Sequence, residues 1–121
     1  MVPSGPMRRN LPTILLTIAL AGVLLYFGVV KFTEPLAWVG FLPPWMDGVF
    51  GLPKETWLHV IGVIEIVLAV LLVIPIRRMR QVAAVLIVLH LAGIISQVGF
   101  NDVAIRDAGL LLSCLALLFL I

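Results

Sequence analysis

Glu65 is the residue whose chemistry most needs explaining, because it is the only acidic side chain inside a continuous apolar stretch. The stretch runs from Thr56 to Pro75, TWLHVIGVIEIVLAVLLVIP, and about 20 apolar residues are enough to cross a bilayer as a helix. A charge at the centre of such a helix costs roughly 2.5–3.5 kcal/mol on insertion scales, so it is retained where other groups compensate for it. Glu65 is therefore either a protonated group in one structural hydrogen bond or part of a functional polar site.

Other polar side chains fall at matching depths in the neighbouring apolar stretches. Counted at about 1.5 Å per residue from one membrane surface, His90 lies as deep as Glu65. Lys31 ends the first apolar run, and Arg106 and Asp107 begin the last one, nearer to the same surface. The cations offset the carboxylates, so such a site would be neutral. We expect a polar core formed by Lys31, His59, Glu65, His90, Arg106 and Asp107.

Each of these residues also has a simpler explanation. His90 could donate to Glu65 or relay a proton near neutral pH, or it could only clamp two helices together. Lys31 and Arg106 could snorkel from helix ends to the surface, and Asp107 could serve only the N-terminal dipole of its helix. The sequence leaves open which cation pairs with Glu65.

The composition is that of an integral membrane protein. Of 121 residues, 63% are hydrophobic and 12% charged, with a mean hydropathy of +1.25, whereas soluble domains are about 45–50% apolar and about 25% charged. The thinly spread basic residues do not indicate nucleic-acid binding. Cys114 is the single cysteine, which excludes an intramolecular disulfide and a CxxC pair. The histidines and carboxylates lack the ligand spacing of a metal site.

The elements that must position these residues are four membrane-spanning helices. We expect an all-α, four-helix transmembrane bundle forming a single domain, residues 1–121, with spans at about 11–32, 56–75, 81–98 and 103–121. The connector at 33–55 is rich in proline and glycine, which excludes a regular span, and in tryptophan, which favours the membrane interface. It is predicted to form an interfacial or re-entrant cap between the first two spans, with its tryptophans serving as anchors rather than stacking on a ligand.

The basic residues of the short loops predict the orientation. Arg8, Arg9, Arg77, Arg78 and Arg80 lie on one side, and Lys31, Lys54 and Arg106 lie on the other. Both termini should therefore be cytoplasmic, with the cap outside, in a plasma (inner) membrane. The first apolar run is too long for a signal-peptide core and is read as a retained span.

Helical spacing predicts which faces converge. Polar and small residues recur every three to four positions in three of the spans, and small residues let helices approach closely in lipid. The expected stripes are Ala21, Leu24, Gly28 and Lys31; His59, Gly62, Glu65 (or Ile66) and Ala69; and Ala83, Leu86, His90, Gly93 and Gln97.

The order of these motifs resembles the DoxX-like family of small four-helix membrane proteins. The resemblance rests on Gly28-x-x-Lys31, on Gly62-x-x-Glu65, on arginines leading into the alanine-bearing third span, and on Asp107. It covers the chain from about Leu15 onward. The stretches FGVVKFTEP, IGVIEI and LHLAGIISQVGFND also resemble the eukaryotic branch that includes the acetylcholine-receptor chaperone.

The resemblance implies several roles. Some DoxX-type members are named as subunits of thiosulfate:quinone oxidoreductase, and others associate with redox partners or act as assembly chaperones. By matched position Lys31, Glu65 and Asp107 take the family's polar-core role, while Arg106, His59 and His90 rest on depth and spacing alone. The chain lacks the cysteine pair of the related quinone-linked disulfide enzymes, which argues against thiol redox chemistry of its own.

Three functions follow as hypotheses. The first is an accessory membrane protein, without independent enzymatic activity, that binds a quinone or similar amphipathic ligand and serves a membrane redox complex. Its partner would be a membrane or redox protein, or a second copy of the same chain. Lys31 or His90 would hydrogen-bond a ligand oxygen, and Glu65 would tune or exchange the proton. The second is a chaperone or interaction module whose charges specify the fold. The third is a proton-coupled transporter, which four spans without an inverted repeat make the least favoured.

Overall fold

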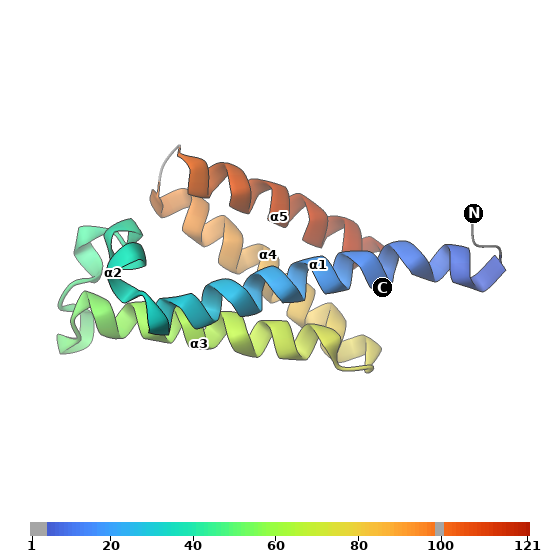
Figure 1. Cartoon of the computed structure of the whole chain (residues 1–121), viewed down its shortest axis with the longest axis horizontal. Coiled ribbons are helices and arrows are strands. Elements are labelled where there is room, and N and C mark those ends of the chain that lie inside the picture. The colour runs from blue at the N-terminus through green and yellow to red at the C-terminus, as the bar shows by residue number, and fades with distance from the viewer. Residues whose placement is uncertain (1–4, 99–100) are drawn as a thin grey trace.

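The computed structural model describes residues 5–98 and 101–121, and this part of the chain is all-α (Figure 1). The side chains of residues 5–9 and 98 lie outside the description, so Arg8 and Arg9, which contribute to the predicted orientation, are not placed. The elements are α1 (Gly5–Thr33), α2 (Pro35–Trp38), η1 (Val39–Phe41), η2 (Pro44–Met46), η3 (Val49–Gly51), α3 (Lys54–Val73), α4 (Arg77–Val98) and α5 (Asp102–Leu120).

The long helices α1, α3, α4 and α5 form the expected four-helix bundle. Within them, four segments are long and apolar enough to cross a membrane: Asn10–Thr33, Lys54–Val73, Arg77–Gln97 and Asp102–Leu120. Helix α1 packs chiefly on α3 and α4 chiefly on α5, and contacts between α3 and α4 and between α1 and α5 join the pairs (Figure 1). The predicted fold class is confirmed.

The turn between α3 and α4 is shorter than the sequence analysis expected. The prediction began the third span at residue 81, but α4 already begins at Arg77. Pro75 is the last residue there that opposes helix formation, and arginine is a good helix former. The basic segment therefore belongs to the first turn of the helix.

The apolar core fills the half of the bundle away from the cap. Its members are small or branched side chains with almost no exposure: Leu20, Ala21, Leu24, Leu68, Ala69, Leu72, Ala83, Ala84, Ile87, Leu91, Cys114 and Leu117. The Sγ atom of Cys114 lies 3.3 Å from the carbonyl oxygen of Ala84. Cys114 is thus a small residue packed in a helix interface. Large apolar side chains such as Ile18 and Phe119 remain exposed, and they are the surface that lipid would cover.

Residues 34–53, here called the cap, close one end of the bundle with α2 and the short 3-10 turns. Gly48 and Gly51 have φ angles of 96° and 74°, which residues without a Cβ adopt readily and which let the chain reverse tightly. The indole nitrogen of Trp57 donates to the carbonyl oxygen of Val49 at 3.2 Å. The amide of Lys54 donates to Asp47 at 3.2 Å. These bonds fix the end of the cap to the start of α3.

Candidate functional site

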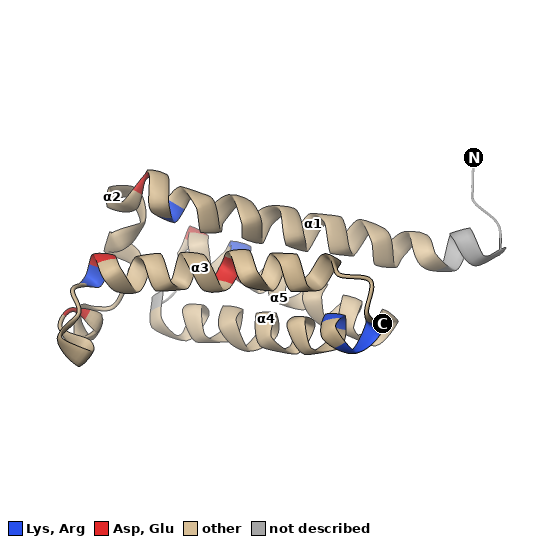
Figure 2. Ribbon diagram, turned by 90° about the horizontal axis from the view of Figure 1, so that it is seen from below, with Lys and Arg blue, Asp and Glu red and all other residues tan. Residues whose placement is uncertain are grey.

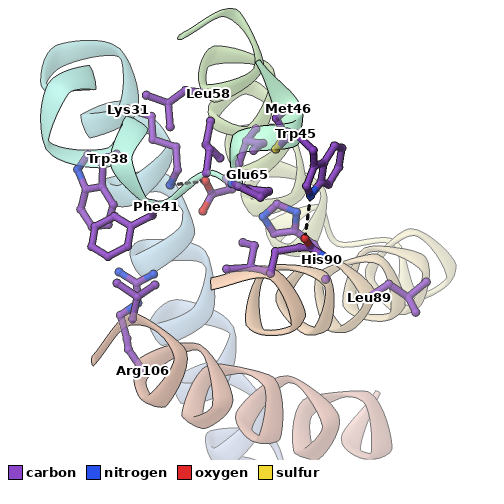
Figure 3. Close-up of a pocket in the computed structure, with 17 residues that line it drawn as sticks. Lys31, Trp38, Phe41, Trp45, Met46, Leu58, Glu65, Leu89, His90 and Arg106 are labelled. Carbon is purple, nitrogen blue, oxygen red and sulfur yellow. Dashed lines mark hydrogen bonds and ion pairs between the residues drawn. The ribbon is translucent and has the colours of Figure 1, made fainter. Parts of the chain in front are cut away.

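Lys31 and Glu65 form a buried ion pair between α1 and α3. The Nζ atom of Lys31 lies 2.5 Å from Oε1 of Glu65, and the two side chains are only 9% and 6% exposed. Lys31 Nζ also donates to the carbonyl oxygen of Phe27, one turn earlier, at 3.2 Å. The mid-span carboxylate therefore has a cationic partner, and it is Lys31 (Figure 3).

The glycines that precede the pair explain why it can form. Gly28 and Gly62 lie three residues before Lys31 and Glu65, so each charged residue shares a helix face with its glycine. A Cβ built on Gly28 would lie 2.7 Å from Cγ1 of Ile66, which is too close for any real side chain. The antiparallel helices thus approach through glycine, and the Lys31 side chain reaches back along α1 to place its ammonium against the Glu65 carboxylate.

Arg106 and Asp107 form a second pair at the start of α5. The Nη2 and Nε atoms of Arg106 lie 2.8 Å and 3.0 Å from Oδ1 of Asp107. Asp107 is buried, whereas the Arg106 side chain is 31% exposed. The guanidinium also lies over the Phe27 ring, 4.2 Å from its centroid, an arrangement that favours arginine over lysine.

A cavity of about 340 Å³ lies between the cap and the bundle. Its polar lining comes from all four long helices, and the cap supplies an aromatic and apolar roof (Figure 3). The lining residues are Lys31, Trp38, Phe41, Leu42, Pro43, Trp45, Met46, Leu58, Ile61, Glu65, Leu89, His90, Gly93, Ile94, Gln97, Val103 and Arg106. Apolar walls with a few convergent polar groups are typical of small-molecule sites.

His90 carries an unused polar atom on the cavity wall. Its Nε2 is buried and has no hydrogen-bond partner among the described residues. A buried polar group without a partner costs free energy, about 1–3 kcal/mol. A ligand oxygen or a water in the cavity would satisfy it, so His90 is a candidate contact for a ligand.

One hydrogen bond ties the roof to the wall. The indole nitrogen of Trp45, in the cap, donates to Oε1 of Gln97, near the end of α4, at 3.0 Å (Figure 3). Both side chains are exposed at this point. The bond therefore joins the two sides of the cavity at its edge and can break without disturbing the core.

The structure brings together most, but not all, of the predicted polar core. Lys31, Glu65, His90 and Arg106 line the cavity. Asp107 does not line it and pairs with Arg106 instead.

His59 lies outside the cavity, against the expectation that it would share the face of Glu65. Its ring stacks on Phe32 at 4.9 Å, with an interplanar angle of 8°. The inward face of α3 is formed by Leu58, Gly62 and Glu65, with a spacing of four and then three residues. His59 is one residue beyond Leu58, and one residue turns a helical side chain by about 100°.

The predicted stripe on the third span is only partly correct. His90, Gly93 and Gln97 line the cavity, but Leu86 is 43% exposed. Ala83, another member of the stripe, is buried in the apolar core together with Ala84, Ile87 and Leu91. The helix therefore presents different faces to the cavity and to the apolar core.

The cap aromatics, predicted from the sequence to be membrane anchors, also lie over the cavity. Trp38, Phe41 and Trp45 form part of the lining. The clustering of aromatic residues beside Met46 in a segment too broken to span a membrane was the available signal. Among residues 5–98 and 101–121, no group of three His, Cys, Asp or Glu side chains could hold a metal ion.

The four apolar helices and the enclosed charges define a small multi-pass membrane protein. Residues 20–110 match the family described as a domain of unknown function, DUF8561, and the chain belongs to that family. The matched span includes every residue that lines the cavity. The match assigns no activity and does not place the chain in the DoxX-like family. Comparison with curated proteins and with solved structures gives no match.

Proposed function

We propose that this protein is a DoxX-like accessory component of a membrane redox system and binds a quinone-like amphipathic ligand in the cavity beneath the cap. The observation that carries the proposal is the unpartnered Nε2 of His90 on the wall of an otherwise largely apolar, aromatic-roofed cavity. Such a cavity suits a flat ring bearing polar oxygens better than it suits a strongly hydrated solute.

The polar residues have donors to spare for such a ligand. A lysine ammonium has three N–H donors; Lys31 directs Nζ to the Phe27 carbonyl and to Glu65, which leaves one. His90 can donate or accept through Nε2, according to its tautomer. We expect these groups to hydrogen-bond the ligand oxygens, while Trp38 and Phe41 contact its ring.

The proton chemistry would lie with Glu65 and His90. A quinone, when bound, supplies electron transfer coupled to protonation of its oxygens. Glu65 can take up or release a proton against the fixed charge of Lys31, 2.5 Å away, and His90 lines the same cavity. Because Cys114 is the single cysteine, the chain has no dithiol of its own, and a redox partner protein would supply or accept the electrons.

The test is the lipid extract of the purified protein. Protein isolated in a mild detergent should carry quinone above the level found with an unrelated membrane protein from the same cells, measured by chromatography and mass spectrometry. Glu65→Gln should reduce the retained amount, because it removes the charge that orients Lys31. An extract with no enrichment in quinone would remove this function.

A second function, a membrane chaperone or interaction module, is favoured by the position of the Lys31–Glu65 pair directly beside the glycine contact of α1 and α3. A charge pair in that place can specify which helices associate. Affinity purification from native membranes distinguishes the two functions. This alternative predicts one reproducible partner protein and no retained quinone.

A further inference from the structure

A second hollow, of about 460 Å³, lies at the end of the bundle away from the cap. It is formed by α1 and by the chain around the α3–α4 turn. The residues that line it, here called the arginine hollow, are Asn10, Thr13, Ile14, Thr17, Ile18, Val73, Pro75 and Arg80. It shares no residue with the cavity beneath the cap.

Arg80 is held in a fixed orientation in this hollow. Its Nε donates to the carbonyl oxygen of Leu72 at 3.1 Å, at the end of α3, and its Nη2 donates to Oγ1 of Thr17 at 2.6 Å. The Thr17 hydroxyl in turn donates to the carbonyl oxygen of Thr13 at 2.7 Å. A guanidinium has five N–H donors, so donors remain for a ligand.

Within the part of the chain that the structure describes, no carboxylate pairs with Arg80. The ion pairs of the described residues join Lys31 to Glu65 and Arg106 to Asp107. The acidic segments lie at the cap end or in the middle of α3, and the start of α4 is basic (Figure 2). Helix α4 begins at Arg77, so the positive end of its dipole is at the same level.

We propose that the arginine hollow binds the headgroup phosphate of an anionic phospholipid, with Arg80 as the main contact. The planar guanidinium matches the oxygens of a phosphate, and the Asn10 and Thr13 side chains add polar groups. Ile14 and Ile18 flank the hollow and are 51% and 65% exposed, which gives an acyl chain an apolar surface to lie against.

The chemistry of the hollow fits a lipid rather than free phosphate. Most of its wall is apolar, and Ile14 and Ile18 continue it onto the side of α1 that lipid would cover. The distribution of Lys and Arg predicts that this end faces the cytoplasm, where the leaflet is rich in anionic lipids. An arginine near that surface raises the binding affinity for an anionic headgroup about fivefold.

The experiment is a lipid titration of the full chain in detergent, read by native mass spectrometry and by thermal unfolding. Phosphatidylglycerol, phosphatidylcholine and inorganic phosphate are compared as added ligands. The wild-type protein should retain phosphatidylglycerol about fivefold better than phosphatidylcholine. Arg80→Gln should lose that preference, and Arg78→Gln, an exposed arginine outside the hollow, should keep most of it.

Arg80→Gln also removes a hydrogen bond from the end of α3, so a second variant is needed. Thr13→Val leaves the backbone acceptor for Thr17 in place and should weaken phosphatidylglycerol binding without lowering the unfolding temperature. Equal retention of the two lipids by the wild-type protein would overturn the proposal. So would equal losses in Arg80→Gln and Arg78→Gln, or stabilisation by inorganic phosphate as large as that by phosphatidylglycerol.

Discussion

Gly28 and Gly62 face each other across the α1–α3 interface in a reciprocal contact. A Cβ on Gly28 would lie 3.0 Å from the carbonyl oxygen of Gly62, and a Cβ on Gly62 would lie 3.0 Å from the carbonyl oxygen of Gly28. The backbones are thus as close as side-chain-free residues allow, as in other small-residue helix pairs in lipid. The two helices run in opposite directions, so Lys31 lies level with Gly62. Its side chain reaches back past the glycine contact to Glu65, so the geometry of the ion pair depends on this contact.

Gly62→Ala should therefore destabilise the bundle. The added methyl would also lie 2.9 Å from Cε2 of Phe32, and forcing extra volume into a packed interface costs about 1–3 kcal/mol. The measurement is the free energy of unfolding in mixed detergent micelles. Gly22→Ala is the matched control, because a Cβ at Gly22 has no neighbour within 4 Å. Equal stability of the two variants would show that the glycine contact is not tight.

Removing one member of the buried ion pair should cost more than removing both. Lys31→Met leaves Glu65 without its cation, and stranding a buried charge costs about 3–5 kcal/mol. The double variant Lys31→Met/Glu65→Gln should recover a large part of that loss. A double-mutant cycle on the unfolding free energy measures the coupling. Additive losses would mean that the two groups do not interact in the membrane.

Arg106→Lys should weaken the start of α5 although it keeps the charge. Lysine loses the second N–H contact to Asp107 and the position over the Phe27 ring, which together are worth about 1–2 kcal/mol. Arg78→Lys, at an exposed position, is the control and should leave the unfolding free energy unchanged. If Arg106→Lys were as stable as the wild type, the contacts of Arg106 with Asp107 and Phe27 would not contribute to stability.

Gln97→Leu should loosen the roof of the cavity. It removes the acceptor of the Trp45 indole at 3.0 Å, a bond worth about 0.5–1.5 kcal/mol. Backbone amides of η2 should then exchange hydrogen faster, while those in the middle of α4 should not. Ser96→Ala is the control, since the Ser96 hydroxyl bonds within its own helix, to the Gly93 carbonyl. Unchanged exchange in η2 would show that the cap is held by other contacts.

The fold could be predicted from the sequence because a membrane leaves few alternatives. Long apolar segments interrupted by Pro75 and by the prolines of the connector can only be helices joined by short segments. The boundaries were less certain, as the early start of α4 at Arg77 shows. Arg77, Arg78 and Arg80 were assigned to a loop, but they form the first turn of α4 because no proline follows Pro75 there.

The sequence predicted how deep in the membrane each site residue lies, but not toward which neighbouring helix its side chain points. Depth placed Lys31 and Arg106 at the same level, so it could not say which of them pairs with Glu65. The glycine contact decides this, because it brings α1, not α5, against that face of α3. His59 shows the same limit, since an error of one residue on a helix turns a side chain away from the cavity.

The sequence predicted a cap, but spacing rules could not place its aromatic rings over the cavity. The cap has no periodic pattern, and its path depends on positive φ angles at Gly48 and Gly51. Spacing rules describe regular helices and strands, so they do not say where the aromatic rings of such a segment point. The placement of Trp38 and Trp45 over the cavity therefore required the structure.

The most direct test of the central claim compares His90→Leu with His59→Leu in binding a short-chain quinone. The purified protein is titrated with the quinone, and binding is followed by quenching of fluorescence from Trp38 and Trp45, which line the cavity. His90→Leu removes the free Nε2 and should weaken binding about fivefold or more, as loss of one hydrogen bond to a ligand implies. His59→Leu, outside the cavity, should bind as the wild type does. Equal affinities of the two variants, or no saturable quenching in the wild type, would contradict the account.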